Sequence, residues 1–189
     1  MAPVELRPTG VTSDGDAVGR ESSGRVVFVP GALPGERLLV QIESERPKSA
    51  VGRLTEIIEP SQQRVIPPCP MVSLGCGGCQ WQHASGQEQR RMKVEIATNA
   101  VRRGGVEPPP AVTTVELPEW DYRTTIRAAV VGGRAGFRRR ESHDVLEVPE
   151  CLIAHPLLAD LLVNGRYEGA SEVTLRCGAR TGERLAATV

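Results

Sequence analysis

Residues 25–42 read RVVFVPGALPGERLLVQI, two runs of strand-forming residues on either side of a turn rich in glycine and proline. β-Branched and aromatic side chains favour strands, whereas Gly and Pro favour turns. Runs of the same kind lie at residues 4–6, 16–19 and 50–58. Five strands in sixty residues are too few for two packed sheets, so the sequence predicts a small closed β-barrel over residues 1–60.

Length and composition restrict the class of protein. The chain has 189 residues, 40% of them hydrophobic, enough for one medium domain or two small ones with a real core. It contains neither a signal-like start nor a window of about 20 apolar residues, so we expect a cytoplasmic protein with no membrane partner. Five cysteines, an odd number, favour metal ligation plus one spare thiol, Cys177, over a disulfide framework.

The charge is unevenly distributed along the chain, although the net charge is zero. Residues 61–140 carry twelve basic and six acidic side chains, whereas the segments on both sides are net acidic. Arginine supplies almost all of the positive charge, and its guanidinium matches the geometry of phosphate. The pattern predicts a face that binds an anion. The alternative is that these arginines are ordinary solvated surface charges.

A cysteine motif is the strongest chemical signal. Cys76 and Cys79 are separated by two glycines, Cys69 lies seven positions upstream, and Cys151 follows far downstream. Two thiolates at this spacing can converge on one metal centre, and the third can close around it. The absence of Cβ atoms at residues 77–78 lets the backbone wrap tightly and direct amides at sulfur. Iron-sulfur and zinc both remain open from the residues alone.

Residues 61–189 are predicted to form an α+β domain with antiparallel hairpins. A helix starts at Ser85, carries an apolar stripe from Met92 to Val101 that should pack inward, and ends at a glycine cap, Gly104. The other expected elements are strands 122–131 and 134–140 joined by a Gly-Gly turn, strand 144–148, helix 156–163, and a second hairpin from strands 172–176 and 183–189.

The first hairpin concentrates arginines beside aromatic rings, a combination that binds phosphate and stacks on unpaired bases. The alternative is that the rings are core residues of an ordinary hairpin. The three histidines, at positions 83, 143 and 155, have no ligand spacing, and we assign no catalytic residue. The RNA-binding candidates are Arg123, Arg127, Phe137, Arg138, Arg139 and Arg140.

Two ordered sets of motifs resemble known families. Residues 15–20 and 27–36 resemble the TRAM domain, a small OB-like RNA-binding barrel that helps deliver enzymes to structured RNA. Motifs from Ser61 to Cys151 resemble the cluster-binding segment of the RNA uracil-C5 methyltransferases, which make 5-methyluridine in rRNA or tRNA. The matching positions are Ser61, Arg64, 68–70, 76–79, Gln82, His83, Gln89, Lys93, Tyr122, Arg123, 136–138, Ser142, His143 and Cys151.

The second resemblance implies a cofactor. In that family four cysteines hold a 4Fe-4S cluster, and the matching positions here are Cys69, Cys76, Cys79 and Cys151. Six residues separate the first two where the commoner pattern has five, a difference that a loop can absorb. Four thiolates would also satisfy zinc, which remains the alternative. The resemblance covers nearly the whole chain but is thin after Cys151.

The family's catalytic parts are not found in this sequence. Its S-adenosylmethionine-binding Rossmann-like domain, its nucleophilic cysteine and its carboxylate base have no match among these 189 residues. We therefore expect the RNA-recognition and cluster-bearing part of such an enzyme, inactive alone and continuing beyond the apolar Val189, with S-adenosylmethionine bound only by the full-length protein. The oligomeric state and the target uridine are not indicated.

Two alternatives remain. Radical enzymes that modify tRNA also combine a cluster with a TRAM domain, but they use three closely spaced cysteines and the opposite domain order. A stand-alone, non-catalytic RNA-binding protein with a zinc or iron-sulfur centre is the other alternative. A stop codon directly after the last residue would favour it.

Overall fold

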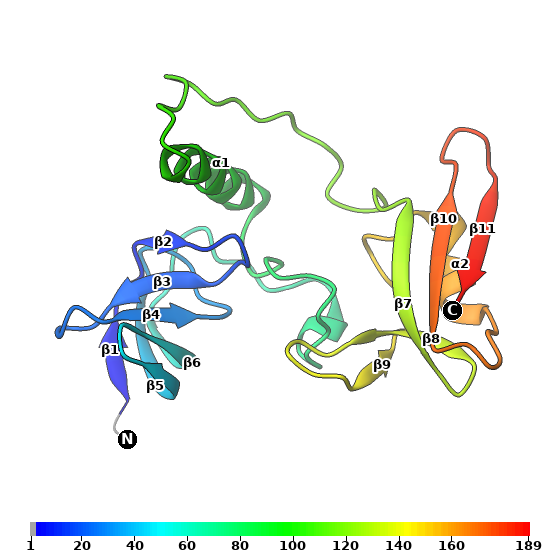
Figure 1. The fold of residues 1–189 in the computed structure, drawn as a ribbon, viewed down its shortest axis with the longest axis horizontal. Coiled ribbons are helices and arrows are strands. Elements are labelled where there is room, and N and C mark those ends of the chain that lie inside the picture. Colours follow the sequence, from blue (N-terminus) through cyan, green and yellow to red (C-terminus); the bar gives the residue numbers. More distant parts are fainter. Residues whose placement is uncertain (1–2) are drawn as a thin grey trace. The chain divides into compact units, whose positions relative to one another are not determined.

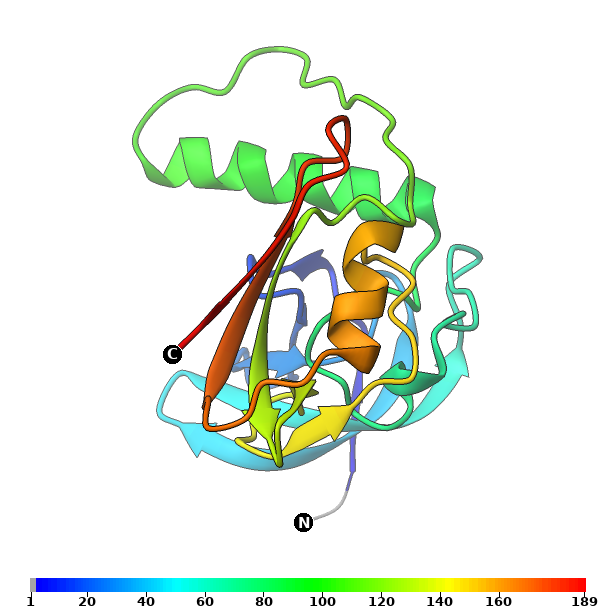
Figure 2. The same cartoon turned by 90° about the vertical axis from the view of Figure 1, so that its right-hand side faces the viewer.

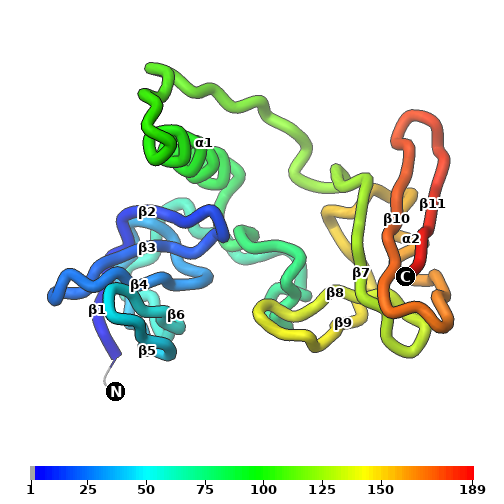
Figure 3. The backbone as a smooth tube through the Cα atoms, viewed as in Figure 1, coloured from blue at the N-terminus to red at the C-terminus, as the bar shows by residue number. Residues whose placement is uncertain are grey.

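The computed structural model describes residues 3–189, which fall into two compact units. Unit 1 comprises residues 3–66 and 80–115, and unit 2 comprises residues 67–79 and 116–189. The chain therefore passes from one unit to the other three times, and its path can be followed in Figure 3. The predicted domain boundary at residue 60 stays a prediction, because compact packing alone does not define a domain.

Unit 1 is built on one curled sheet of six strands in the order β1-β5-β6-β4-β3-β2 (Figure 1). Only the β4–β6 pairing is parallel. Three register shifts between β5 and β6 curl the sheet, as β-bulges do. The strands are β1 (Val4–Leu6), β2 (Gly10–Val11), β3 (Ala17–Arg20), β4 (Val26–Val29), β5 (Arg37–Arg46) and β6 (Ser49–Glu59).

The predicted all-β barrel is confirmed as a curled half-barrel. It differs from the prediction in two details. β1 and β2 are the edges of the sheet, so the sheet is not closed, and the two-residue β2 is a sixth strand. A strand that short has no recognisable alternation, so the sequence pattern could not reveal it. Alternate residues of β4 and β5 face inward, including Val27, Val29 and Leu38, each at most 1% exposed.

Helix α1 (Gly86–Arg103) completes unit 1. The Ser85 hydroxyl accepts a hydrogen bond from the Glu88 amide at 3.2 Å, which confirms the predicted N-cap. The expected inward stripe is only partly correct. Met92 is 1% exposed and packs with Leu33 and Ala84, but Val101 is 37% exposed. Burial along α1 therefore decreases toward its C-terminal end, where residues 100–103 are exposed.

Unit 2 contains a five-stranded sheet in the order β11-β10-β7-β8-β9, antiparallel throughout (Figure 1). The expected Gly-Gly turn joins β7 to β8, with positive φ at both glycines (59° and 74°). Its elements are the 3-10 helix η1 (Pro70–Val72), β7 (Thr125–Val131), β8 (Arg134–Arg138), β9 (Val145–Glu147), α2 (Pro156–Asn164), β10 (Glu172–Cys177) and β11 (Arg184–Thr188).

Helix α2 packs on one face of this sheet, as Figures 1 and 2 show. Leu158 and Leu162 of α2 are at most 1% exposed and meet the inward residues of β10, Val173 and Leu175. The opposite face of the sheet carries no helix of unit 2 and is called the outer face below. This α+β arrangement confirms the predicted class for the second half of the chain. No helix among residues 3–189 combines the length and the apolar character needed to cross a membrane.

Candidate metal centre and basic surface

Three of the predicted ligands lie on a short loop of unit 2. Cys69 immediately precedes η1, and Met71 within η1 is 5% exposed and packs in the core of unit 2. The chain then turns at Gly75, where φ is +82°. The Cys76 amide donates back to the Met71 carbonyl at 3.0 Å. Cys69 and Cys76 therefore flank one closed turn that is anchored in the core.

This cysteine loop, residues 69–79, is bound to the end of the β8–β9 hairpin. Cys76 forms an isolated antiparallel bridge with Arg139. The Gly77 amide donates to the Arg138 carbonyl at 3.0 Å, and the Arg140 amide donates to the Gly75 carbonyl at 2.9 Å. Two segments distant in sequence are thus joined in the manner of paired strands, and they run side by side in Figure 3.

The two glycines between Cys76 and Cys79 have different roles. A Cβ atom at Gly77 would lie 2.9 Å from the Arg138 carbonyl oxygen, closer than real Cβ contacts come, so the pairing with the hairpin requires glycine. The backbone amide of Gly78 is directed at the Cys76 sulfur and lowers the pKa of that thiol. The geometry agrees with the expectation that small residues here allow close wrapping and aim an amide at sulfur.

Cys151 comes from a different element of the same unit. It opens a turn that leads into α2, in which the Ala154 amide donates to the Cys151 carbonyl at 3.0 Å. Ala154 bridges Arg123, which ties this turn to the chain entering β7. The amides of Ile153 and Ala154 both point at the Cys151 sulfur and lower its pKa. Amides aimed at sulfur stabilise a thiolate, the form that binds metals.

Burial opposes this effect at both thiols. Burial is the largest cause that raises the pKa of Cys76 and of Cys151 above the ordinary value of 9.0, and the neighbouring Cys79 and Cys69 raise it further by charge repulsion. Cys69, Cys76 and Cys151 also pack against the same core cluster of unit 2. A half-buried thiolate needs a compensating cation, so the site favours neutral thiols unless a metal is bound.

The thiols do not form a finished coordination shell. Within residues 3–189, no group of three or more His, Cys, Asp or Glu side chains is arranged to hold a metal ion. Thiolate ligands lie only about 2.3 Å from a bound zinc ion. The four predicted ligands therefore belong to the same unit, but the structure does not show a metal site.

The outer face of the sheet in unit 2 is rich in arginine. Residues directly opposite each other in antiparallel strands point to the same side, and so do alternate residues of one strand. The register of β7 with β8 and β10 therefore places four arginines on the outer face, away from the core residues Ile126 and Val173. These arginines are Arg127, Arg134, Arg138 and Arg176.

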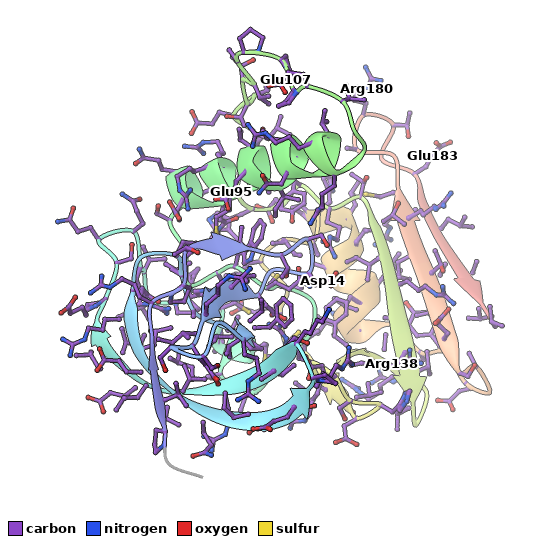
Figure 4. The ribbon with its side chains drawn as sticks, turned by 60° about the vertical axis from the view of Figure 1, so that its left-hand side comes forward. Asp14, Glu95, Glu107, Arg138, Arg180 and Glu183 are labelled. Carbon is purple, nitrogen blue, oxygen red and sulfur yellow. The ribbon has the colours of Figure 1, made fainter. Side chains whose placement is uncertain are left out.

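Two of these four arginines form ion pairs with neighbouring glutamates. Arg127 pairs with Glu172, and Arg134 pairs with Glu147 at 2.8 Å. Arg138, labelled in Figure 4, and Arg176 are both exposed. Sequence reasoning did not select Arg176, because its shared face with Arg127 depends on the pairing of β10 with β7. The sequence did contain one signal that could have selected Arg176: it is a basic residue at an outward-facing position of the expected strand 172–176.

The remaining predicted RNA-binding residues do not share this face. Phe137 alternates with Arg138 along β8, is partly buried and packs against the core, and its role in RNA binding stays a prediction. Arg139 donates from its guanidinium to the Leu74 carbonyl in the cysteine loop. Arg140 is half-buried with its Nε atom 3.8 Å from Glu141, and Arg123 is half-buried near the turn of Cys151.

Two histidines have local structural roles, as the sequence led us to expect. A ring nitrogen of His83 lies 3.4 Å from the Ala32 carbonyl oxygen in unit 1. The Nδ1 atom of His155 accepts a hydrogen bond from the Leu157 amide at 3.3 Å and caps α2. His143 is exposed. None of these contacts indicates a catalytic role.

Comparison with known proteins agrees with this geometry. A family model described as the TRAM domain matches residues 4–55. An uncharacterised RNA methyltransferase of Streptomyces avermitilis is 36% identical, and the match covers 96% of this chain and 46% of the relative. The 23S rRNA (uracil(1939)-C(5))-methyltransferase RlmD of Halomonas elongata is 37% identical, covering 84% of this chain and 34% of the relative.

A solved structure shares the fold. The tRNA (uracil-54, C5)-methyltransferase of Pyrococcus abyssi, in complex with S-adenosyl-L-homocysteine, superimposes with a TM-score of 0.59 and 20% identity over 96% of this chain and 44% of that one. The chain spans less than half the length of these relatives. In sequence and in fold, it corresponds to the N-terminal region of the RNA uracil-C5 methyltransferases and begins with their TRAM domain.

Proposed function

We propose that this chain is the RNA-recognition and 4Fe-4S-binding part of an S-adenosylmethionine-dependent RNA (uracil-C5-)methyltransferase acting on rRNA or tRNA. The observation that supports the cofactor proposal is that four half-buried thiols belong to unit 2, three of them packed against its core, with backbone amides directed at Cys76 and Cys151. Such amides are a recurrent feature of cysteines that ligate iron-sulfur clusters.

Cys69, Cys76, Cys79 and Cys151 would hold the cluster. The donor set fits the group, because four thiolates satisfy a cubane and their charge would offset the cost of burying a cation. When bound, the cluster would supply an inorganic cross-link between the cysteine loop and the turn before α2. Zinc is the competing occupant, since four thiolates also meet its tetrahedral preference.

Metal analysis of the anaerobically purified chain tests this assignment. We expect a brown protein with about four irons per chain. Replacing Cys151 by serine should abolish the brown colour of the cluster, whereas replacing Cys177, the spare cysteine of β10, should not. About one zinc per chain would support the alternative, and a protein with neither metal after reconstitution would contradict the proposal.

RNA would contact both units. The TRAM domain and the likeness to RNA methyltransferases support an RNA partner. In unit 2 the outer face offers two exposed arginines without acidic partners, Arg138 and Arg176, beside the paired Arg127 and Arg134. Phosphate contacts dominate the affinity of proteins for nucleic acid, and arginine suits them. Binding to a structured rRNA or tRNA transcript, measured by filter retention, tests this part.

Methyl transfer would require parts that the relatives have outside the matched region. The relatives are about two to three times as long as the matched region, and no glycine-rich strand-to-helix turn for S-adenosylmethionine occurs in this sequence. We therefore expect the chain alone to bind RNA without methylating it. Transfer of labelled methyl groups from S-adenosylmethionine to a uridine-containing transcript by this chain alone would contradict that expectation.

A further inference from the structure

The end of the β8–β9 hairpin, residues 138–144, is held in its own shape by contacts that do not involve the cysteine loop. The Arg139 amide donates to the Asp144 carbonyl at 2.8 Å, and the Ser142 amide donates to the Arg139 carbonyl at 3.2 Å. The Ser142 hydroxyl accepts from the Asp144 amide at 3.0 Å. The turn is therefore internally hydrogen-bonded.

One residue of this turn has an unfavourable backbone conformation. Glu141 has a φ of +53°, in the left-handed region that non-glycine residues avoid. Such a conformation costs on the order of 1 kcal/mol and persists only where surrounding contacts impose it. The turn thus behaves as a rigid element rather than as an adaptable loop.

This rigid turn presents one edge to the cysteine loop. The Arg138 carbonyl and the Arg140 amide bond to Gly77 and Gly75. Between them the Arg139 guanidinium donates to the Leu74 carbonyl, and its Nη1 atom lies 3.6 Å from where a Cβ atom of Gly75 would be. Main-chain and side-chain contacts therefore hold both sides of Cys76.

We infer that residues 138–144 act as a clamp that preorganises the cysteine loop for metal, with Arg139 as the positioning residue. The inference rests on the proposed metal site, to which it adds a residue that is not a ligand. Four thiolates around zinc or around a 4Fe-4S core leave a net charge of about −2. A guanidinium bonded to this loop offsets part of that charge, and the clamp lowers the entropy that the loop loses when metal binds.

The test compares Arg139→Gln with Arg166→Gln in the full chain. Arg166 is a matched control because its guanidinium also donates to backbone carbonyls of unit 2, those of Asn164 and Gly165. Amide hydrogen exchange at Gly77 and Arg140 is measured in the metal-free protein. Release of zinc or iron to a chelator is measured after reconstitution. Protection of the β7–β8 amides verifies that the sheet remains folded.

We expect Arg139→Gln to accelerate exchange at Gly77 and metal release by about 10-fold, in the lower range for residues that support metal ligands. Arg166→Gln should change neither rate. Arg139→Lys, which keeps the charge and one donor, should restore part of the protection and shift the visible absorption of the reconstituted chain less than Arg139→Gln does. Equal rates in Arg139→Gln and the control would overturn the inference.

A second variant keeps the test decisive if Arg139→Gln does not fold. Gly77→Ala places a Cβ atom against the Arg138 carbonyl at the end of β8 and should separate the loop from the clamp, while the β7–β8 amides again verify that the sheet remains folded. Gly77→Ala with unchanged exchange at Arg140 would count against the clamp. If the wild-type chain binds no metal although its Gly77 amide is protected from hydrogen exchange, the proposed metal site is refuted. The contact between the loop and the clamp would then still stand.

Discussion

The two units differ in how their buried polar groups are balanced. In unit 1, Glu36 is 0% exposed, and its carboxylate accepts hydrogen bonds from the Leu33 and Ser61 amides and from the Arg64 guanidinium. In unit 2 the thiols of Cys76 and Cys151 are only half-buried, and burial raises the pKa of each while backbone amides lower it. The buried carboxylate of unit 1 therefore has its cation within the unit, whereas these thiols, once ionised, would gain from a bound metal cation.

The two tryptophans allow each unit to be monitored separately. Trp81 belongs to unit 1, where its indole donates to the Gly15 carbonyl at 2.9 Å. Trp120 belongs to unit 2. In a Trp120→Phe background the fluorescence reports unit 1, and in a Trp81→Phe background it reports unit 2. Each prediction below uses these two backgrounds.

The largest expected effect is in unit 1. Arg64→Met leaves the buried Glu36 carboxylate without its cation, and breaking a buried pair in this way costs about 3–5 kcal/mol of unfolding free energy. Urea denaturation followed by Trp81 fluorescence measures the loss. Arg53→Met removes a surface pair with Glu43, in which both side chains are more than half exposed, and should leave the midpoint unchanged. Equal destabilisation by both variants would contradict the special contribution of the buried Glu36–Arg64 pair to unit 1.

Metal should affect unit 2 alone. A metal held at 100 times its dissociation constant stabilises the folded form by about 2.7 kcal/mol. Adding a chelator to the reconstituted chain should therefore lower the unfolding midpoint reported by Trp120 and leave that reported by Trp81 unchanged. Cys151→Ser should abolish the response. A chelator effect on the Trp81 signal of similar size would show that the two units do not respond independently.

RNA affinity should depend on the unpaired arginines of the outer face. Removing one phosphate contact reduces the slope of log affinity against log salt by about 1. Arg138→Gln and Arg176→Gln should each show this reduction. Arg184→Gln provides the comparison, because Arg184 lies on β11 and pairs with Asp160 at 3.2 Å. If this variant weakens binding as much as the other two, the outer face is not the RNA surface.

The smallest expected effect is a pH dependence in unit 1. Although burial raises it, hydrogen bonds from Arg64, Leu33 and Ser61 hold the pKa of Glu36 below its ordinary value of 4.5. A lowered pKa in the folded state contributes stability that is present above pH 4.5 and lost as the pH falls through the folded value. Thermal unfolding of wild type and Glu36→Gln between pH 7 and pH 3 measures this loss. The curve of the variant should be flatter over the acidic range.

Local elements were largely predictable from sequence. Ser85 before an apolar stripe identified the start of α1, and the Gly132-Gly133 pair identified the turn between β7 and β8. The extent of burial was less predictable. The apolar stripe of α1 was expected to pack inward along its length, but of its described residues Met92 alone is fully buried, and burial falls away until residues 100–103 are exposed.

The candidate site, too, was predictable from sequence only in part. The spacing of Cys69, Cys76 and Cys79 was sufficient to nominate a local loop, and the family resemblance nominated Cys151. The role of Arg139 was not predictable, because its bond to the Leu74 carbonyl joins residues 65 positions apart. The sequence left Phe137 open as an RNA-binding or a core residue, and the alternation of β8 places it partly buried against the core.

The amino-acid sequence by itself determined the strands, helices and turns, the charge distribution and the set of thiols, because these follow from short-range backbone preferences and from residue identity. Only the tertiary structure decided which arginines share the outer face and which residues support the cysteine loop. It also decided that Glu36 is buried with Arg64. These depend on strand register and on contacts between distant segments, which packing selects and local sequence does not encode.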